Sequence, residues 1–266
     1  MQSSPLPHPR MRRAALGLLG LALILTLAAV PPTAGQRTPA HAGIAPSFTP
    51  SPTATPSPTA TPFLEPEGCW PPPEDYSRVW VGNAQLNART LAMLDHAQAL
   101  YWAQGGFVDF RLAITQGSYN AGSVAASFGT HDGGGAVDLS VRSRINWEVL
   151  TDEIEPMVRA LRVAGFAAWL RAPDELYPGS PIHIHAVAIG DREQSAAARA
   201  QIDGTFGYLR GFDGIPQPDG IPRPDRHGGP VLCQWMRDLG YEDLRGRPVP
   251  TATPGGTANP RQAGGA

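Results

Sequence analysis

The sequence of 266 residues contains no lysine, so arginine supplies all 21 of its basic residues. Enzymes that form a Schiff base through lysine are therefore excluded, as are phosphate-binding loops that depend on a lysine. The chain also has no large excess of positive or negative charge, since its net charge at pH 7 is only −2. A nucleic-acid-binding surface needs concentrated positive charge, so we expect no nucleic acid among the partners.

The N-terminal segment 1–35 is predicted to be an export signal or a membrane anchor. Arg10, Arg12 and Arg13 precede an uncharged run from Ala14 to Val30, which is rich in leucine and alanine and is followed by small residues. This order is typical of a secretory signal peptide. A run of this length is also close to the minimum for one membrane span, so a retained anchor is the alternative. In both cases we expect the rest of the chain to be extracytoplasmic, secreted or anchored at the cell surface, with membrane contact only through this segment.

Two further segments lack the apolar residues that a folded core requires. Residues 36–66 consist mainly of Thr, Pro, Ser and Ala, and residues 248–266 repeat this composition. Such segments cannot bury enough apolar surface to fold, and their prolines favour extended chain. We therefore expect a disordered linker and a disordered tail on either side of one folded domain, 67–247.

Cysteine is nearly absent, and the only two, Cys69 and Cys233, lie near the two ends of the expected domain. In an exported chain an even pair is most simply a disulfide. The alternative is two unpaired buried thiols, which are less common outside the cytoplasm.

Within 67–247, apolar periodicity predicts an α+β fold. Helices are expected over 88–102, with Asn87 as the N-cap, and over 151–164 and 195–209. Strands are expected over 110–115, 136–141, 166–170 and 182–189. This order predicts a small, mostly antiparallel sheet with flanking helices.

The segment from His131 to Asp138 carries the first candidate for a functional site. Three glycines, Gly133–Gly135, separate the histidine from the strand that contains the aspartate. Strand alternation places Val137 and Leu139 on the core face and Asp138 on the opposite face. Glycines permit the backbone angles that turn His131 back toward that opposite face.

A second candidate, His183-Ile184-His185, opens a later strand. Two histidines two residues apart lie on one strand face, so both can reach the same site. His131, Asp138 and either His185 or His183 would then provide the two nitrogen ligands and one carboxylate of a catalytic zinc site. The alternative is a plain glycine turn and a pair of solvent-exposed imidazoles.

The pattern His131-x-x-Gly134-x-Ala136-x-Asp138, followed by a His-x-His strand, resembles zinc D-alanyl-D-alanine carboxypeptidases and dipeptidases of the VanX and VanY type. The resemblance covers about residues 107–190 and implies the hedgehog/DD-peptidase fold. It also implies that His131 and Asp138 are zinc ligands, with His183 or His185 as the third.

The turn at residues 116–119 stands where this family has a Ser-Gly-Tyr-Arg turn. The resemblance therefore implies that Ser118 and Tyr119 contact substrate. The sequence departs from the family pattern at two points here. Gly129 stands where the family has a serine two residues before the first histidine, and the arginine of the turn is replaced near Asn120.

A third departure concerns the general base, which in many family members is an acid three residues before the last ligand. Here those positions hold Ser180 and Ile182. Three substitutes are considered: a carboxylate from the 171–181 loop, a carboxylate beside the first ligand, or whichever of His183 and His185 is not a ligand. The carboxylates concerned are Asp174, Glu175 and Asp132.

Three arginines are candidates for binding a substrate carboxylate through the fork geometry of guanidinium. They are Arg111, Arg142 and Arg171, and the alternative for each is ordinary surface charge.

Taken together, these observations favour an exported zinc peptidase that hydrolyses D-Ala-containing stem peptides of peptidoglycan. The alternative is a non-catalytic metal- or wall-binding module of the same fold. A purely structural zinc site is less favoured, because three protein ligands leave one position open.

Overall fold

The structure is a computed structural model that describes residues 63–122 and 127–248. The predicted signal or anchor at 1–35 lies outside the described residues, as do nearly all of the linker at 36–66 and of the tail at 248–266. Within the described ranges, no helix is both long and apolar enough to cross a membrane.

The domain is built around one antiparallel sheet of four strands in the order β3-β4-β6-β5, with a separate two-stranded hairpin, β1-β2. This confirms the predicted α+β class with a small antiparallel sheet. The strands are β1 (Arg78–Val81), β2 (Ala84–Asn87), β3 (Ile114–Gln116), β4 (Ala136–Ser140), β5 (Phe166–Arg171) and β6 (His183–Ala188).

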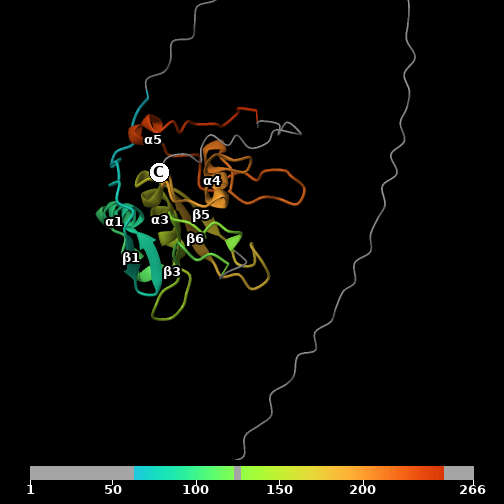
Figure 1. Ribbon diagram of the computed structural model, residues 1–266. Coiled ribbons are helices and arrows are strands. Elements are labelled where there is room, and N and C mark those ends of the chain that lie inside the picture. The colour runs from blue at the N-terminus through green and yellow to red at the C-terminus, as the bar shows by residue number, and fades with distance from the viewer. Residues whose placement is uncertain (1–62, 123–126, 249–266) are drawn as a thin grey trace, which may run out of the picture. The chain divides into compact units, whose positions relative to one another are not determined.

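Two long helices pack side by side against one face of the sheet, and the shorter helical segments lie elsewhere around it (Figure 1). The helical elements are α1 (Ala88–Ala103), α2 (Phe110–Ala113), α3 (Thr151–Val163), α4 (Ala196–Asp203), the 3₁₀ turn η2 (Tyr208–Arg210) and α5 (Gln234–Asp238). The side chain of Asn87 caps α1 by accepting a hydrogen bond from the amide of Thr90, as predicted from the sequence.

The strand predicted over 110–115 is wrong in its first part. Residues Phe110–Ala113 form the single helical turn α2, and only Ile114–Gln116 is strand. The side chain of Asp109 accepts a hydrogen bond from the Leu112 amide at 3.0 Å, which satisfies a free amide at the start of the turn. This N-cap outweighs the alternating pattern.

The third helix is shorter than the predicted 195–209. The helix α4 ends at Asp203, because Gly204 adopts an extended conformation in which a side chain would collide with the Ala200 carbonyl. A separate 3₁₀ turn, η2, follows. The hairpin β1-β2 and the short helix α5 were not predicted.

Each face of the sheet contributes to its own hydrophobic cluster. The face with Val137, Leu139 and Ile184 packs against α1 and α3. The opposite face contributes Val187 and Trp169 to a second cluster with α4, η2 and α5. Asp138, His183 and His185 belong to this second face by strand alternation, as predicted. Polar residues therefore continue the same face beyond the apolar cluster.

The irregular segment 211–230 is fastened to α3 by one buried arginine. Arg162 donates to the carboxylate of Asp225 at 2.5 Å, to the carbonyl of His227 at 2.7 Å and to the carbonyl of Ala168. Only 2% of the Arg162 side chain and 1% of the Asp225 side chain are exposed. This buried ion pair fixes the segment that forms one wall of the pocket described below.

The predicted disulfide between Cys69 and Cys233 is confirmed, with a sequence separation of 164 residues. It joins the chain just before β1 to the residue that caps α5. A cross-link over so long a loop restricts the unfolded chain far more than the folded one. Such a bond is also characteristic of proteins outside the cytoplasm.

We predict that the double substitution Cys69→Ser and Cys233→Ser lowers the free energy of unfolding by about 2–5 kcal/mol. The cause is the conformational freedom that the unfolded chain regains. Guanidinium unfolding of the variant and of the oxidised and reduced wild type measures the change. Equal midpoints for the oxidised and reduced protein would contradict a stabilising disulfide.

Candidate metal centre

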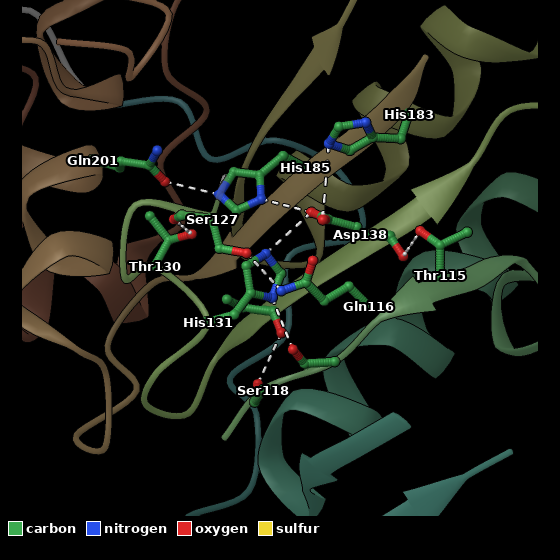
Figure 2. A network of polar contacts seen from close by, with 12 residues as sticks. Thr115, Gln116, Ser118, Ser127, Thr130, His131, Asp138, His183, His185 and Gln201 are labelled. Atoms are coloured by element: carbon green, nitrogen blue, oxygen red, sulfur yellow. Dashed lines mark hydrogen bonds and ion pairs between the residues drawn. The ribbon is translucent and has the colours of Figure 1, made fainter. Parts of the chain in front are cut away.

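Three buried side chains form a group that could bind a metal ion: His131, Asp138 and His185. One ligand atom from each lies within 4.8 Å of the other two. Nε2 of His131 is 3.3 Å and Nδ1 of His185 is 2.7 Å from Oδ1 of Asp138. Figure 2 shows the two imidazoles converging on this carboxylate. Donors around a tetrahedral ion with bonds of about 2.0–2.1 Å lie roughly 3.3 Å apart, so small shifts suffice to complete the site.

The sheet register explains how two of these residues meet. Asp138 on β4 lies directly opposite His185 on β6, and His185 lies opposite Trp169 on β5. Facing residues on paired strands bring their Cβ atoms to about 4.5–5.5 Å. The Trp169 ring stacks on the His185 ring with 6.2 Å between centroids, which fixes the imidazole from behind.

The glycine loop brings His131 to the same place from outside the strand. Gly135 has a φ of +83°, and the amide of Gly134 donates to the Glu193 carbonyl at 2.7 Å. A side chain at Gly133 would collide with the backbone of residues 193–195. Glycine is therefore required for this close approach, and the loop directs His131 back over the face that bears Asp138.

Hydrogen bonds on the far side of each imidazole fix its tautomer. Nδ1 of His131 donates to the Gly117 carbonyl at 2.8 Å, and Nε2 of His185 donates to Oε1 of Gln201 at 2.8 Å. In the neutral rings, the remaining nitrogen lone pairs then face the Asp138 carboxylate. Lone pairs directed at a buried anion require a cation between them, either a proton or a metal ion. Partners of this kind orient the histidine ligands of metal sites.

In the absence of metal, the pKa values of Asp138, His131 and His185 are all shifted by burial and by one another. Burial raises the pKa of Asp138, but the imidazoles of His131 and His185 outweigh it and hold that pKa well below its ordinary value. Burial lowers the pKa of His131, but the charge of Asp138 prevails and raises it. For His185 burial prevails and lowers the pKa. The raised pKa of His131 favours a proton on this imidazole beside the ionised Asp138.

His183, the other predicted ligand, lies beside this group and was expected as an alternative to His185. Its Nδ1 donates to the Pro181 carbonyl at 2.8 Å, which leaves Nε2 free. That nitrogen is 3.8 Å from Oδ2 of Asp138, whereas His131 and His185 contact Oδ1. The geometry favours His185 as the third ligand and leaves His183 next to the site.

The candidate acids of the sequence analysis are engaged elsewhere. The carboxylate of Asp174 accepts a hydrogen bond from Gly179, and that of Glu175 accepts one from Ala172. Both bonds close the 171–181 loop on itself. Asp132 is exposed, and none of the three acids lines the pocket around the metal group. The structure does not bring these carboxylates to the site.

The predicted substrate contacts at Arg111, Ser118 and Tyr119 also lie away from the pocket lining. Arg111 is exposed on α2 and pairs with Asp95 at 2.6 Å. Ser118 is buried and donates to the Ala136 carbonyl.

The Tyr119 hydroxyl donates to Glu193 at 2.5 Å and accepts from Asn87. Ser118 and Tyr119 therefore support the glycine loop in this structure.

Two partners of the site were missed from the sequence. Gln201 comes from α4, and no local pattern indicates that a helix following β6 returns to His185. The Gly117 carbonyl is a backbone group and has no side-chain signal. The glycine at position 117 lets this turn pack closely against β2, because a side chain there would collide with the Gln85 carbonyl. The unpredicted hairpin thus supports the turn that orients His131.

The metal group opens into a pocket of about 330 Å³. Its walls include the β3-β4 side, the segment 127–131, the 171–181 loop, α4 and the irregular segment 211–230. Representative lining residues are Gln116, Ser140, Tyr177, Gln201 and Pro216. The exposed aromatic residues Phe128 and Trp147 also line it.

Comparisons with protein-family models, curated proteins and solved structures gave no match. The family resemblance therefore rests on the motif residues alone, while the metal-binding geometry stands independently of it.

We predict that the purified chain binds one zinc ion and that His131→Ala or Asp138→Ala weakens binding by more than about 100-fold. Gln201→Ala, which removes only an orienting partner, is expected to cost roughly 10–100-fold. Competition with a chromogenic chelator measures each affinity. His227→Ala is the matched control, because His227 pairs with the exposed Glu155 outside the pocket. Wild-type affinity in His131→Ala and Asp138→Ala would contradict the assignment.

We further predict that zinc affinity falls on acidification. Metal must replace the proton on His131, whose pKa is raised by Asp138. Below that raised pKa, each unit of pH costs about tenfold in affinity for one displaced proton. Isothermal titration in buffers of different ionisation enthalpy counts the protons released. Zinc binding without proton release below that pKa would contradict the claim that zinc displaces a proton from His131.

Proposed function

We propose that this chain is a zinc-dependent peptidase that acts on D-Ala-containing stem peptides of peptidoglycan. The observation that carries the proposal is the convergence of three imidazole nitrogens on one buried carboxylate in an open pocket. Two of the imidazoles complete a ligand set with Asp138, and the third remains beside it with a free nitrogen.

The donor set fits zinc better than the common oxygen-preferring cations. Two imidazole nitrogens and one carboxylate oxygen form a three-ligand set of the kind found in catalytic zinc sites. Magnesium and calcium instead prefer sites built from oxygen ligands. Zinc bound here would polarise a peptide carbonyl and make water a usable nucleophile near neutral pH.

The position of His183 supports a role in moving the proton that such hydrolysis requires. The Pro181 carbonyl holds its Nδ1–H, so Nε2 carries the lone pair that can accept a proton. This nitrogen faces the pocket at the edge of the Asp138 carboxylate. Imidazole is suited to accept a proton from water and pass it to the leaving amine near neutral pH. Because Asp174 and Glu175 are engaged within their loop, His183 is the preferred general base.

The pocket has a form that suits a short peptide. It runs beside the ends of β4 and β6, and its lining includes two exposed aromatic residues, Phe128 and Trp147. The disulfide fits a protein that works outside the cytoplasm, where wall peptides occur. The motif resemblance to D-alanyl-D-alanine peptidases supplies the choice of stem peptide as substrate.

A non-catalytic metal- or wall-binding module is the second candidate. It is favoured by one observation: among the described residues that line the pocket, Asp138 is the only acidic one, so none of them offers a second carboxylate as a base once metal is bound. The two candidates differ in whether His183 can perform that role alone.

We predict that the zinc-loaded chain hydrolyses acetyl-D-alanyl-D-alanine or a longer stem peptide, and that His183→Ala lowers kcat by about 10²–10⁴-fold. The variant should retain its zinc, because the ligand set is complete without His183. Product release measured by mass spectrometry gives the rates, with His227→Ala as the control. Full zinc occupancy with no cleavage of any stem peptide by wild type would favour the binding module instead.

A further inference from the structure

The loop 142–149, which joins β4 to α3, exposes two large apolar side chains. Ile145 is 95% exposed and Trp147 is 71% exposed. Figure 1 shows this loop projecting beyond the sheet, at the end of the domain opposite α5. Large apolar side chains that gather on an exposed surface mark a place that another molecule or a membrane covers.

The backbone of this loop is hydrogen-bonded within itself. A bridge between Arg142 and Val149 closes the loop, and Nη1 of Arg142 donates to the Trp147 carbonyl at 2.9 Å. The amides of residues 143 and 145–148 all donate to acceptors inside the loop. Backbone groups that are already paired lose little when water is removed. A segment that enters a bilayer must meet this condition.

Trp147 is held in a conformation that side chains rarely adopt. Its φ is +63°, and its amide donates to the Ser143 carbonyl at 3.0 Å. Such conformations cost free energy for any residue except glycine and are concentrated at binding surfaces. The loop therefore presents the indole outward in a fixed position.

The charge of the loop favours an anionic surface only weakly. Arg142 and Arg144 stand against Glu148, so the loop keeps one net positive charge. A basic residue near an anionic bilayer contributes attraction. Asp132 and Asp174 are exposed on neighbouring segments and oppose it. Most of the affinity for a bilayer must therefore come from the apolar side chains.

Two further aromatic side chains extend this surface around the mouth of the pocket. Phe128 is 65% exposed, and Tyr177 is exposed on the 171–181 loop. Both line the pocket together with Trp147, so three separate segments present aromatic rings at one opening. Aromatic side chains, Trp and Tyr above all, are concentrated where a membrane meets water.

A glycan strand is the other ligand that exposed aromatic side chains suit. A sugar ring stacks on the flat face of an aromatic side chain, which Phe128 and Trp147 offer. Ile145 has no such face, yet it is the most exposed of the four apolar side chains. This observation favours a bilayer over a glycan.

We infer that the loop 142–149 inserts Ile145 and Trp147 into the surface of an anionic bilayer, with Phe128 and Tyr177 at the interface. This contact is separate from any made by the segment 1–35, and it does not depend on the proposed peptidase function. Because Trp147 also lines the pocket, the docked domain presents the mouth of its pocket to the membrane surface. Ligands then reach the metal group from that surface.

A fluorophore at position 145 tests this inference in the full chain. Both cysteines form the disulfide, so Ile145→Cys introduces the single thiol available for labelling. The label is a nitrobenzoxadiazole dye, whose emission shifts to the blue in apolar surroundings. Vesicles of equal parts phosphatidylcholine and phosphatidylglycerol are added, with and without a nitroxide-bearing lipid.

We expect a blue shift at position 145 and quenching by the nitroxide. Because the readout is local, binding through the segment 1–35 alone gives no signal. Leu239→Cys is the matched control position, since Leu239 is also apolar and exposed but follows α5 at the other end of the domain.

Substitutions in the labelled chain assign the contact to its residues. Trp147→Ala should weaken vesicle binding at least about tenfold, because a large apolar side chain is no longer buried. Arg144→Gln should weaken binding to the anionic vesicles about fivefold and leave binding to pure phosphatidylcholine unchanged. Trp102→Ala and Arg159→Gln are the matched controls, because both residues are exposed on α1 and α3 and lie outside the pocket lining. Thermal unfolding verifies that each variant folds.

Three results overturn the inference. The first is unchanged emission at position 145 in a chain that sediments with the vesicles, because another segment then makes the contact. The second is equal quenching at positions 145 and 239, or unchanged quenching in folded Trp147→Ala. The third is a shift produced by soluble glycan fragments of peptidoglycan but not by vesicles, which assigns the loop to a glycan instead. No metal or peptide enters these measurements, so their failure is distinct from failure of the proposed peptidase.

Discussion

The buried carboxylate of Asp138 is the constraint on which the site depends. It lies in the sheet with imidazole nitrogens of His131, His183 and His185 around it. Backbone and amide partners hold the far sides of the rings, so the nitrogens that face Asp138 cannot all be donors in the neutral state. An ionised carboxylate among lone pairs needs a cation. A proton can meet this need at low pH, and a metal ion held by His131, Asp138 and His185 could meet it at neutral pH.

The rest of the fold keeps these groups rigid. Antiparallel pairing sets Asp138 opposite His185, and the helices on the other face keep the strands in place with a continuous apolar core. The glycine loop and the turn at Gly117 bring in His131 from outside the sheet. Arg162 fastens the irregular segment that walls the pocket, and the disulfide joins the two ends of the domain. A site held on strands at fixed register needs little rearrangement to bind metal.

The sequence predicted the parts of the site that follow from local periodicity. Alternation places Asp138 and the His-x-His pair on one face, and the glycines allow His131 to turn back. Residues whose role depends on tertiary contacts could not be predicted in the same way. Gln201 approaches from α4, and nothing near it in the sequence records that contact.

Among the arginines, composition could not separate Arg111 from Arg171. The first meets an exposed aspartate, while the second is buried beside the pocket. From the sequence, Asp174 and Glu175 were candidates for the general base. Their carboxylates instead accept hydrogen bonds from backbone amides of their own loop, and the loop conformation that allows this could not be read from the sequence. The helical turn at Phe110–Ala113 was missed because a single cap outweighed an alternating pattern of a few residues.

The most direct measurement of the central claim is anomalous diffraction at the zinc absorption edge from crystals of the zinc-loaded chain. The account predicts one strong peak bonded to Nε2 of His131, a carboxylate oxygen of Asp138 and Nδ1 of His185, with His183 outside the ligand set. Zinc found only elsewhere, or no peak in crystals that contain excess zinc at neutral pH, would contradict it.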